Sequence, residues 1–112
     1  MISGAYIYPM NIDSLLALLD QGQDSLILRF GLGQAFLKQG DTEQAIDHLL
    51  QALEFDAEYS AAYKLLGKAY SQTGQAALAI QTYEKGIAVA ESKGDIQAVK
   101  EMRVFLKRLL KD

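Results

Sequence analysis

The side chains that could catalyse a reaction or hold a metal ion are few and scattered in this sequence. His48 is the single histidine, and cysteine is absent. A zinc site needs several imidazole or thiolate ligands, and nucleophilic catalysis needs a nucleophile, a base and an orienting group close together. We expect His48 to be a solvated position in the middle of a helix. The sequence therefore predicts no metal site, no cofactor and no enzymatic activity.

Lysine residues beside apolar residues are a more informative pattern, because their spacing groups them. Lys64 and Lys68 stand four residues apart, which places them on one face of a helix. Phe30 and Leu37 fall on the matching face of an earlier predicted helix. Such a surface favours a ligand that is partly acidic and partly apolar. The alternative is that a preceding leucine-rich helix covers Phe30 and Leu37, and that the two lysines are merely solvated.

The last predicted helix is basic, although the whole chain carries a formal net charge of −3. Its cations can serve structure alone, by offsetting the helix dipole and keeping a terminal helix solvated. The functional alternatives are an acidic protein partner or self-association with the acidic remainder of the chain. Nucleic acid is the least favoured partner, because no basic stretch is interleaved with aromatic residues. The cations are Lys100, Arg103, Lys107, Arg108 and Lys111.

The elements that must position these residues are two copies of one unit. The motif Leu-Gly-x-Ala-aromatic begins at Leu32 and again, 34 residues later, at Leu66. A repeat of this length marks an architecture in which neighbouring units stack on one another. Glycine inside a helix costs about 1 kcal/mol relative to alanine. We therefore expect Gly33 and Gly67 at points where a second helix approaches closely.

This pattern resembles the tetratricopeptide repeat, a helix-turn-helix unit of about 34 residues with small and aromatic residues at fixed offsets. The two copies cover about residues 26–59 and 60–93. Arg29 and Leu49 stand where the family has aromatic residues, and both copies lack the closing proline. The matching positions are Leu32, Gly33, Phe36, Ala45 and Ala52 in the first copy, and Tyr63, Leu66, Gly67, Tyr70, Ala79, Tyr83 and Gly86 in the second.

The resemblance implies an all-α fold in which helix-turn-helix repeats stack as a short right-handed α-solenoid. We expect a single domain over residues 11–112, because the chain is too short for two domains. Since no proline ends the second repeat, its last helix should continue for an extra turn. The expected parts are a capping helix 11–22, repeat one 26–59, repeat two 60–93 and a C-terminal capping helix 95–110.

Polar residues predict where the helices begin. Asn11 or Asp13 should cap the first helix, and Asp24 should open the leading helix of repeat one. Asp41 has a glutamine, Gln44, three residues later, which is a variant of the capping box. Six helices are expected in all.

Residues 1–10 are expected to be a flexible segment outside the domain. They lack the basic start and the uninterrupted apolar core of a secretory signal. Because helical periodicity begins only at Asn11, either Met1 or Met10 could be the natural start. No apolar run approaches the roughly 18 residues that a membrane span requires. Together with the lack of cysteine, this predicts a cytoplasmic protein that does not bind membranes.

In tetratricopeptide proteins the leading helices line a concave groove that receives a peptide or a helix of a partner. The resemblance thus implies a protein-protein interaction adaptor whose ligand is an acidic and apolar segment of another protein. Structural self-association as a homo-oligomer, with no dedicated peptide ligand, is the alternative. Phe30 and Gln34 occupy the positions where some cochaperones clamp a terminal carboxylate, which argues against that activity. The residues that match the groove are Phe30, Gln34, Leu37, Lys38, Lys64, Lys68, Ser71 and Gln72.

Overall fold

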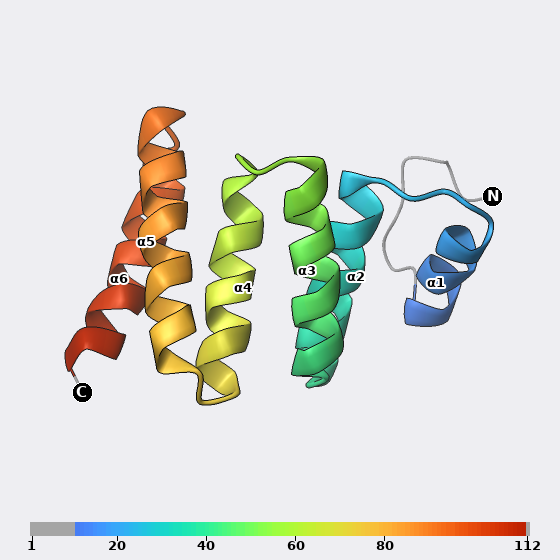
Figure 1. The fold of residues 1–112 in the computed structure, drawn as a ribbon, viewed down its shortest axis with the longest axis horizontal. Helices are drawn as coiled ribbons and strands as arrows, with labels where there is room; N and C mark the ends of the chain where they lie inside the picture. The colour runs from blue at the N-terminus through green and yellow to red at the C-terminus, as the bar shows by residue number, and fades with distance from the viewer. Residues whose placement is uncertain (1–10, 112) are drawn as a thin grey trace.

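The computed structural model describes residues 11–111 as a chain of six helices. The expectations for residues 1–10, including the choice between Met1 and Met10, lie outside this range. No strand occurs among the described residues, so the all-α prediction is confirmed. In chain order the helices are α1 (Ile12–Asp20), α2 (Leu26–Gln39), α3 (Thr42–Phe55), α4 (Ser60–Gln72), α5 (Ala76–Ser92) and α6 (Ile96–Lys111) (Figure 1).

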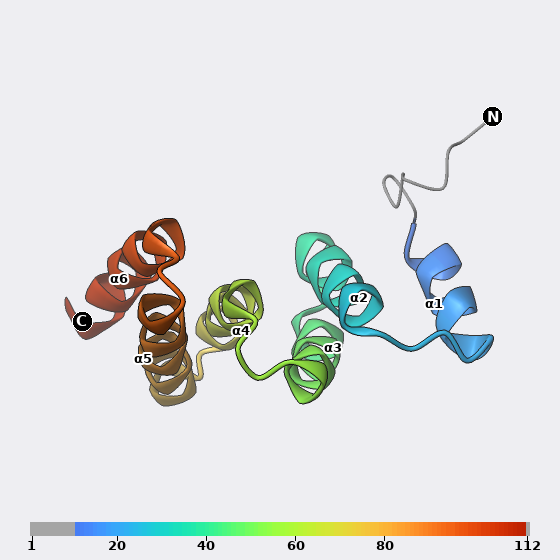
Figure 2. The ribbon, with the colours of Figure 1, turned by 90° about the horizontal axis from the view of Figure 1, so that it is seen from above.

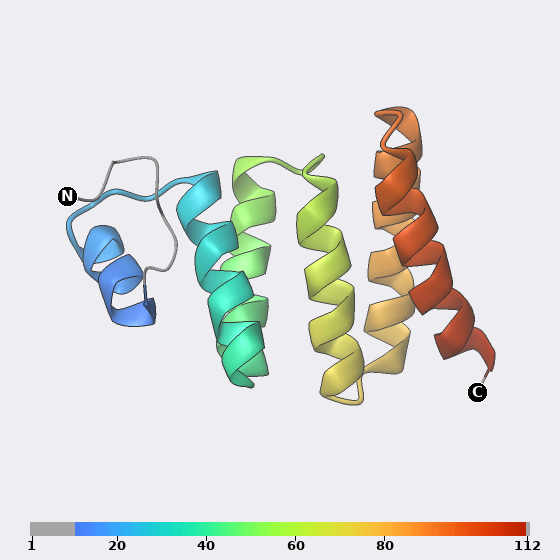
Figure 3. The ribbon, with the colours of Figure 1, turned by 180° about the vertical axis from the view of Figure 1, so that it is seen from behind.

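The helices from α2 to α6 form two layers. Figure 3 shows α2, α4 and α6 on the near side, with α3 and α5 behind them. We call α2, α4 and α6 the leading layer, and α3 and α5 the trailing layer. Seen from above, α4 is set back between α2 and α6, so the leading layer curves inward (Figure 2). Consecutive helices pack on one another along the whole chain, as expected of a helical repeat solenoid.

Local polar contacts set the helix starts, with one difference from the prediction. Asn11 caps α1, because its Oδ1 accepts a hydrogen bond from the Ser14 amide at 2.8 Å. Ser25, and not Asp24, caps α2 through a bond from the Leu28 amide to its Oγ at 3.1 Å. Asp24 instead forms an ion pair with Arg29. The arginine side chain donates two hydrogen bonds to its carboxylate, whereas a helix cap would accept only one from the backbone.

Two glycines allow the layers to approach, as the repeat pattern predicts. A Cβ atom added to Gly33 would lie 2.6 Å from Cγ of Leu49 on α3. One added to Gly67 would lie 2.5 Å from Cε1 of Tyr83 on α5. Both distances are too short for real carbon atoms, so glycine is required where the facing side chain inserts.

Each terminal helix covers the apolar side of the neighbouring repeat. Leu15 of α1 is buried in a cluster with Leu28 and Phe36 of α2. At the other end, Met102 of α6 is fully buried against Tyr63 and Tyr83. A longer α5, of 17 residues against 14 in α3, leads into α6, which agrees with the expected extra turn. None of the helices in the described range is both long and apolar enough to cross a membrane.

Candidate partner-binding face

The candidate site is the outward side of the leading layer. Tyr63, Leu66 and Gly67 turn one side of α4 into the core, which leaves the opposite side of the helix outward. The same arrangement holds for α2. The eight residues predicted from the sequence lie on these two helices: Phe30, Gln34, Leu37 and Lys38 on α2, and Lys64, Lys68, Ser71 and Gln72 on α4.

Most of the predicted polar residues are accessible on this face. Gln34 and Lys38 are exposed on α2, and Lys68 is exposed on α4. Ser71 and Gln72 are exposed near the end of α4. The structure therefore gathers five of the eight residues on one open surface.

The two apolar residues of the prediction have different environments. Leu37 is only 9% exposed and belongs to the cluster that includes Leu15 and the half-buried Leu19 of α1. Leu37 is thus buried, as the alternative interpretation expects, but not by the first helix. Leu28 lines the pocket beside α1, and Leu37 follows it by nine residues, which places Leu37 on the opposite side of α2, toward Ala69 and Leu65 of α4. Phe30 is half-buried and packs edge-to-face on Tyr59, with ring centroids 5.1 Å apart. Part of the Phe30 ring thus remains available on the face.

Lys64 connects two helices of the leading layer. Its Nζ lies 2.8 Å from Oε1 of Glu101 on α6, and Gln97 donates a weaker hydrogen bond to the other carboxylate oxygen at 3.4 Å. The hydrogen bond from Lys64 is the main reason that the pKa of the Glu101 carboxyl is lowered, with Gln97 second. Lys64 is therefore held by the protein itself, whereas Lys68 extends into solvent.

His48 is buried, so the prediction of a solvated histidine is wrong. Only 7% of it is exposed, and its ring stacks on Phe36 with centroids 5.5 Å apart. Nη1 of Arg29 lies 3.1 Å from Nδ1 of His48. Because a guanidinium can only donate, Nδ1 accepts and the ring is neutral. Burial, followed by the charge of Arg29, lowers the pKa of the imidazole.

Asp24 completes this polar cluster between α2 and α3. Its two carboxylate oxygens accept hydrogen bonds from Arg29 at 2.8 and 2.9 Å, which lowers the pKa of the Asp24 carboxyl. The cluster explains why a histidine is tolerated in the core, since each buried polar atom has a partner. In the described part of the chain, no group of three or more His, Cys, Asp or Glu residues is arranged to hold a metal ion.

A third helix contributes to the face, and the sequence interpretation missed it. Val99 and Met102 are the buried residues of α6, as Tyr63 and Leu66 are those of α4. This correspondence sets an offset of 36 residues, two more than the repeat length, because α5 is longer than α3. Applying the offset to the outward positions of α4 gives Gln97, Lys100, Val104, Lys107 and Arg108, all of which are exposed.

The two layers carry opposite charge. The leading layer contains nine lysine or arginine residues and a single acidic residue, Glu101, for a formal charge of +8. The trailing layer contains five acidic residues and only Lys85, for a formal charge of −4. A net charge of −3 for the whole chain hides this segregation. Arg29 and Arg103 are paired with Asp24 and Glu91, so the positive charge of the outward side comes from the other cations of these helices.

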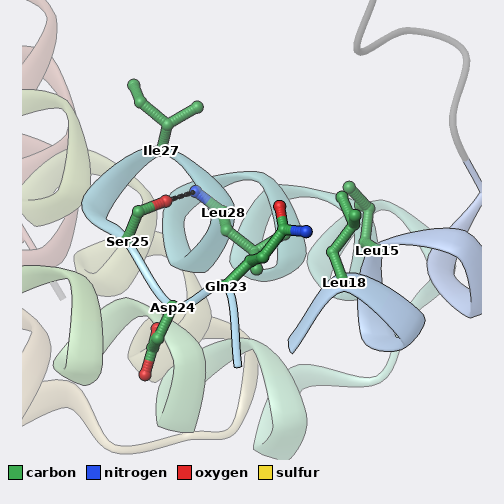
Figure 4. Close-up of a pocket in the computed structure, with 7 residues that line it drawn as sticks. All are labelled: Leu15, Leu18, Gln23, Asp24, Ser25, Ile27 and Leu28. Atoms are coloured by element: carbon green, nitrogen blue, oxygen red, sulfur yellow. Dashed lines mark hydrogen bonds between the residues drawn. The ribbon is translucent and has the colours of Figure 1, made fainter. Parts of the chain in front are cut away.

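A pocket of about 290 Å³ lies beside the face, between α1 and the start of α2 (Figure 4). Its polar groups already have partners: Ser25 accepts the hydrogen bond that caps α2, and Asp24 is paired with Arg29. A specific small-molecule site needs convergent polar groups to orient its ligand, and this pocket offers few. The lining residues are Leu15, Leu18, Gln23, Asp24, Ser25, Ile27 and Leu28.

Comparison with known proteins gives consistent matches along the chain. A family model described as "TPR repeat" matches residues 33–74, and one described as "Tetratricopeptide repeat" matches residues 60–93. A TPR repeat-containing protein of Pseudomonas aeruginosa is 49% identical over 100 residues, which cover 89% of this chain and 95% of that protein.

Solved structures of similar fold exist for two other bacterial proteins. The solution structure of a protein from Bordetella parapertussis superposes with a TM-score of 0.81 at 45% sequence identity, covering 89% of this chain and 87% of the other. The crystal structure of a tetratricopeptide repeat domain protein from Salinibacter ruber has a TM-score of 0.73 at 27% identity, covering 79% and 98%.

Proposed function

Because this chain belongs to the tetratricopeptide repeat family, whose repeats are protein-protein interaction modules, we propose that it is an adaptor that holds a segment of a partner protein on its leading layer. The ligand is a segment with both acidic and apolar side chains, carried as an extended peptide or a helix. A cytoplasmic location and a single domain over residues 11–112 remain predictions from the sequence.

The observation that carries this proposal is the segregation of charge between the layers. Lys38, Lys68 and Lys100 are exposed on the same side of three neighbouring helices, with Phe30 partly accessible beside them. Electrostatic complementarity of this kind selects partners and accelerates their association. An acidic segment would meet cations on the leading layer and repulsion on the trailing layer.

The test is to replace exposed lysines of the face and to measure binding of a partner captured by the intact chain. Lys68→Glu with Lys100→Glu should weaken binding at least about tenfold, because two attractive contacts become repulsive. Lys85→Glu in α5 is the matched control, since it makes the same kind of charge change on the trailing layer. Lys64 is left intact, because a glutamate there would face Glu101 and perturb the fold.

Both sets of variants should melt like the parent protein, which separates lost binding from lost structure. If the double variant binds the captured partner as tightly as the parent, the leading layer is not the docking surface. A loss of binding in Lys85→Glu would point to the trailing layer instead.

Self-association is a second candidate, and the same charge segregation favours it. The positive leading layer of one copy could lie against the negative trailing layer of the next. Sedimentation equilibrium at low and high salt distinguishes the candidates. A monomer at every concentration supports the adaptor, whereas a salt-sensitive oligomer that Lys68→Glu disrupts supports assembly.

A further inference from the structure

We infer that the leading layer binds its ligand in one orientation, with the apolar part of the segment over α2 and the acidic part over α6. This inference rests on the proposed function and adds to it the sequence pattern of the ligand. It also gives α6, which looks from the sequence like a simple end cap, the largest share of the electrostatic recognition.

Positive charge on the face is concentrated on α6. Each leading helix has five equivalent outward positions, and none of these is acidic. Among these positions only Lys38 is basic on α2, and on α4 Lys68 is exposed whereas Lys64 is paired with Glu101. On α6 three of the five positions are basic, namely Lys100, Lys107 and Arg108. A carboxylate-bearing segment is therefore attracted most strongly to the α6 end.

Apolar surface follows the opposite trend. On α2, Ile27 is 54% exposed and the half-buried Phe30 presents part of an aromatic ring. The position on α4 that corresponds to Ile27 is Ala61, which offers a single methyl group. Among the five equivalent positions of α6 the only apolar residue is Val104, which is 48% exposed and flanked by cations, whereas the exposed Ile96 and Leu110 lie outside these positions. Large apolar side chains of a ligand therefore gain most contact over α2.

Glu101 sharpens this difference between the two ends. It is the single acidic residue of the leading layer. Its Oε1 lies 2.8 Å from Nζ of Lys64, so the ammonium group of Lys64 already has a carboxylate partner. A ligand carboxylate at that point would have to displace Glu101 and would then lie beside it. The internal carboxylate thus directs ligand carboxylates away from the middle of the face, toward Lys107 and Arg108.

The chemistry of the whole face favours a protein segment over a nucleic acid. The α2 end is apolar and has one cation, which a uniform chain of phosphates would not use. Nor do aromatic side chains alternate with the cations of α6 to stack bases. With helix axes 8–10 Å apart, the three helices span roughly 20 Å, the length of about six extended residues. The ligand is thus a short peptide with apolar residues at one end and acidic residues at the other.

Paramagnetic NMR can test the orientation directly. The probe is a blocked synthetic peptide with three leucines at one end, four glutamates at the other and a Gly-Ser spacer between them. A nitroxide label is attached at the acidic end in one sample and at the apolar end in another. The first label should broaden backbone amide signals of α6, and the second those of α2. Broadening of the same helices by both labels would overturn the inference.

Affinities of the same peptide for three variants provide an independent test. Lys100→Gln with Lys107→Gln should weaken binding about tenfold at low salt, whereas Lys38→Gln should weaken it less than about twofold. Glu101→Gln should strengthen binding about threefold, because Lys64 is released. Equal losses for the α2 and α6 variants, or weaker binding of Glu101→Gln, would contradict the assigned orientation.

The outcomes separate this inference from the proposed function. A peptide that binds the face with no preferred orientation refutes the inference alone. A peptide that shows no binding at millimolar concentration refutes both. Displacement of the peptide by a single-stranded oligonucleotide of equal charge, at lower concentration and with a steeper salt dependence, would replace the protein segment with a nucleic acid.

Discussion

Repeat one and repeat two have a glycine at the same point of their leading helix, but they fill the space that faces it with different side chains. Gly33 faces the aliphatic Leu49, and Gly67 faces the ring of Tyr83, which is 2% exposed and stacks on Phe105 of α6. The shared requirement is therefore the missing Cβ atom of the glycine. The residue that inserts there can vary with its surroundings.

The repeats also differ one helical turn before these glycines, where the leading helix has Arg29 in repeat one and Tyr63 in repeat two. Repeat two has Tyr63, whose hydroxyl donates to the carbonyl oxygen of Ala57 at 2.7 Å. Repeat one has Arg29, which joins Asp24 and the buried His48 in a polar cluster. Two kinds of interior thus support the same backbone: an aromatic one in repeat two, and a charged, titratable one in repeat one.

The largest effect is expected from filling the glycine positions. Gly67→Leu should lower the free energy of unfolding by about 3 kcal/mol, because the buried ring of Tyr83 cannot move aside. Gly33→Leu should cost less, about 1 to 2 kcal/mol, since an added Cβ atom would lie within 3.0 Å of two atoms of Leu49, against three atoms of the Tyr83 ring. Urea denaturation of both variants measures the difference. Equal losses would mean that the type of facing side chain does not matter.

Removing the Tyr63 hydroxyl should have an intermediate effect. Tyr63→Phe keeps the ring and deletes the hydrogen bond to Ala57, so we expect a loss of about 1 kcal/mol in the free energy of unfolding. Thermal and urea melts of this variant are the measurement. Stability equal to that of the parent would show that ring packing alone anchors repeat two at this point.

The polar cluster of repeat one should make stability depend on pH. The pKa of His48 is lowered from 6.5 in the folded protein, so below that pH the unfolded chain binds more protons. The free energy of unfolding should therefore fall as pH decreases from 6.5 toward the lowered pKa. Asp24 is affected only at more acidic pH, because its pKa is lowered from 3.8. Urea midpoints measured between pH 7.5 and 5 give the slope.

His48→Thr is the matched control for this dependence, because Thr82 holds the corresponding position in repeat two. The variant should lose the slope between pH 6.5 and 5, even if its overall stability is lower. A slope that survives the substitution would come from another group.

The smallest effect is expected at Arg103 of α6, which stands where the other two leading helices have a glycine. Arg103 on α6 corresponds to Gly67 on α4 by the offset of 36, but Arg103 is not packed against a facing side chain as Gly67 is. Its side chain is exposed and pairs with Glu91. Arg103→Ala should therefore change the free energy of unfolding by about 0.5 kcal/mol or less. A loss comparable to that of Gly67→Leu would show that the position has a packing role that the structure does not reveal.

Much of the fold was predictable, because small residues recur where helices must touch. Gly33 and Gly67 have an energetic cost in a helix that only close packing offsets, so their spacing identifies both repeats and their leading helices. The shared face of Lys64 and Lys68 was also predictable, since a spacing of four residues places side chains on one side of a helix. Such signals are local in the sequence, so they can be interpreted without knowing which distant residues pack nearby.

The errors arose where distant residues decide the environment. His48 looked solvated because its partner Arg29 lies 19 residues earlier, and the pairing exists only once α2 and α3 pack together. Leu37 is buried because of the way α2 packs on its neighbouring helices, which periodicity alone does not give. The contribution of α6 was missed because the longer α5 shifts the repeat offset from 34 to 36 residues.

The short first helix has a consequence for motion. With nine residues, α1 is below the length at which isolated helices are stable in water, and among the described helices it packs only on α2. Its amides should therefore exchange with deuterium faster than those of α2 to α6. Each transient detachment would bare Leu28, which lines the pocket between the two helices next to the exposed Ile27. The apolar surface around Ile27 is thus larger in a minor population of the molecule than in its resting form.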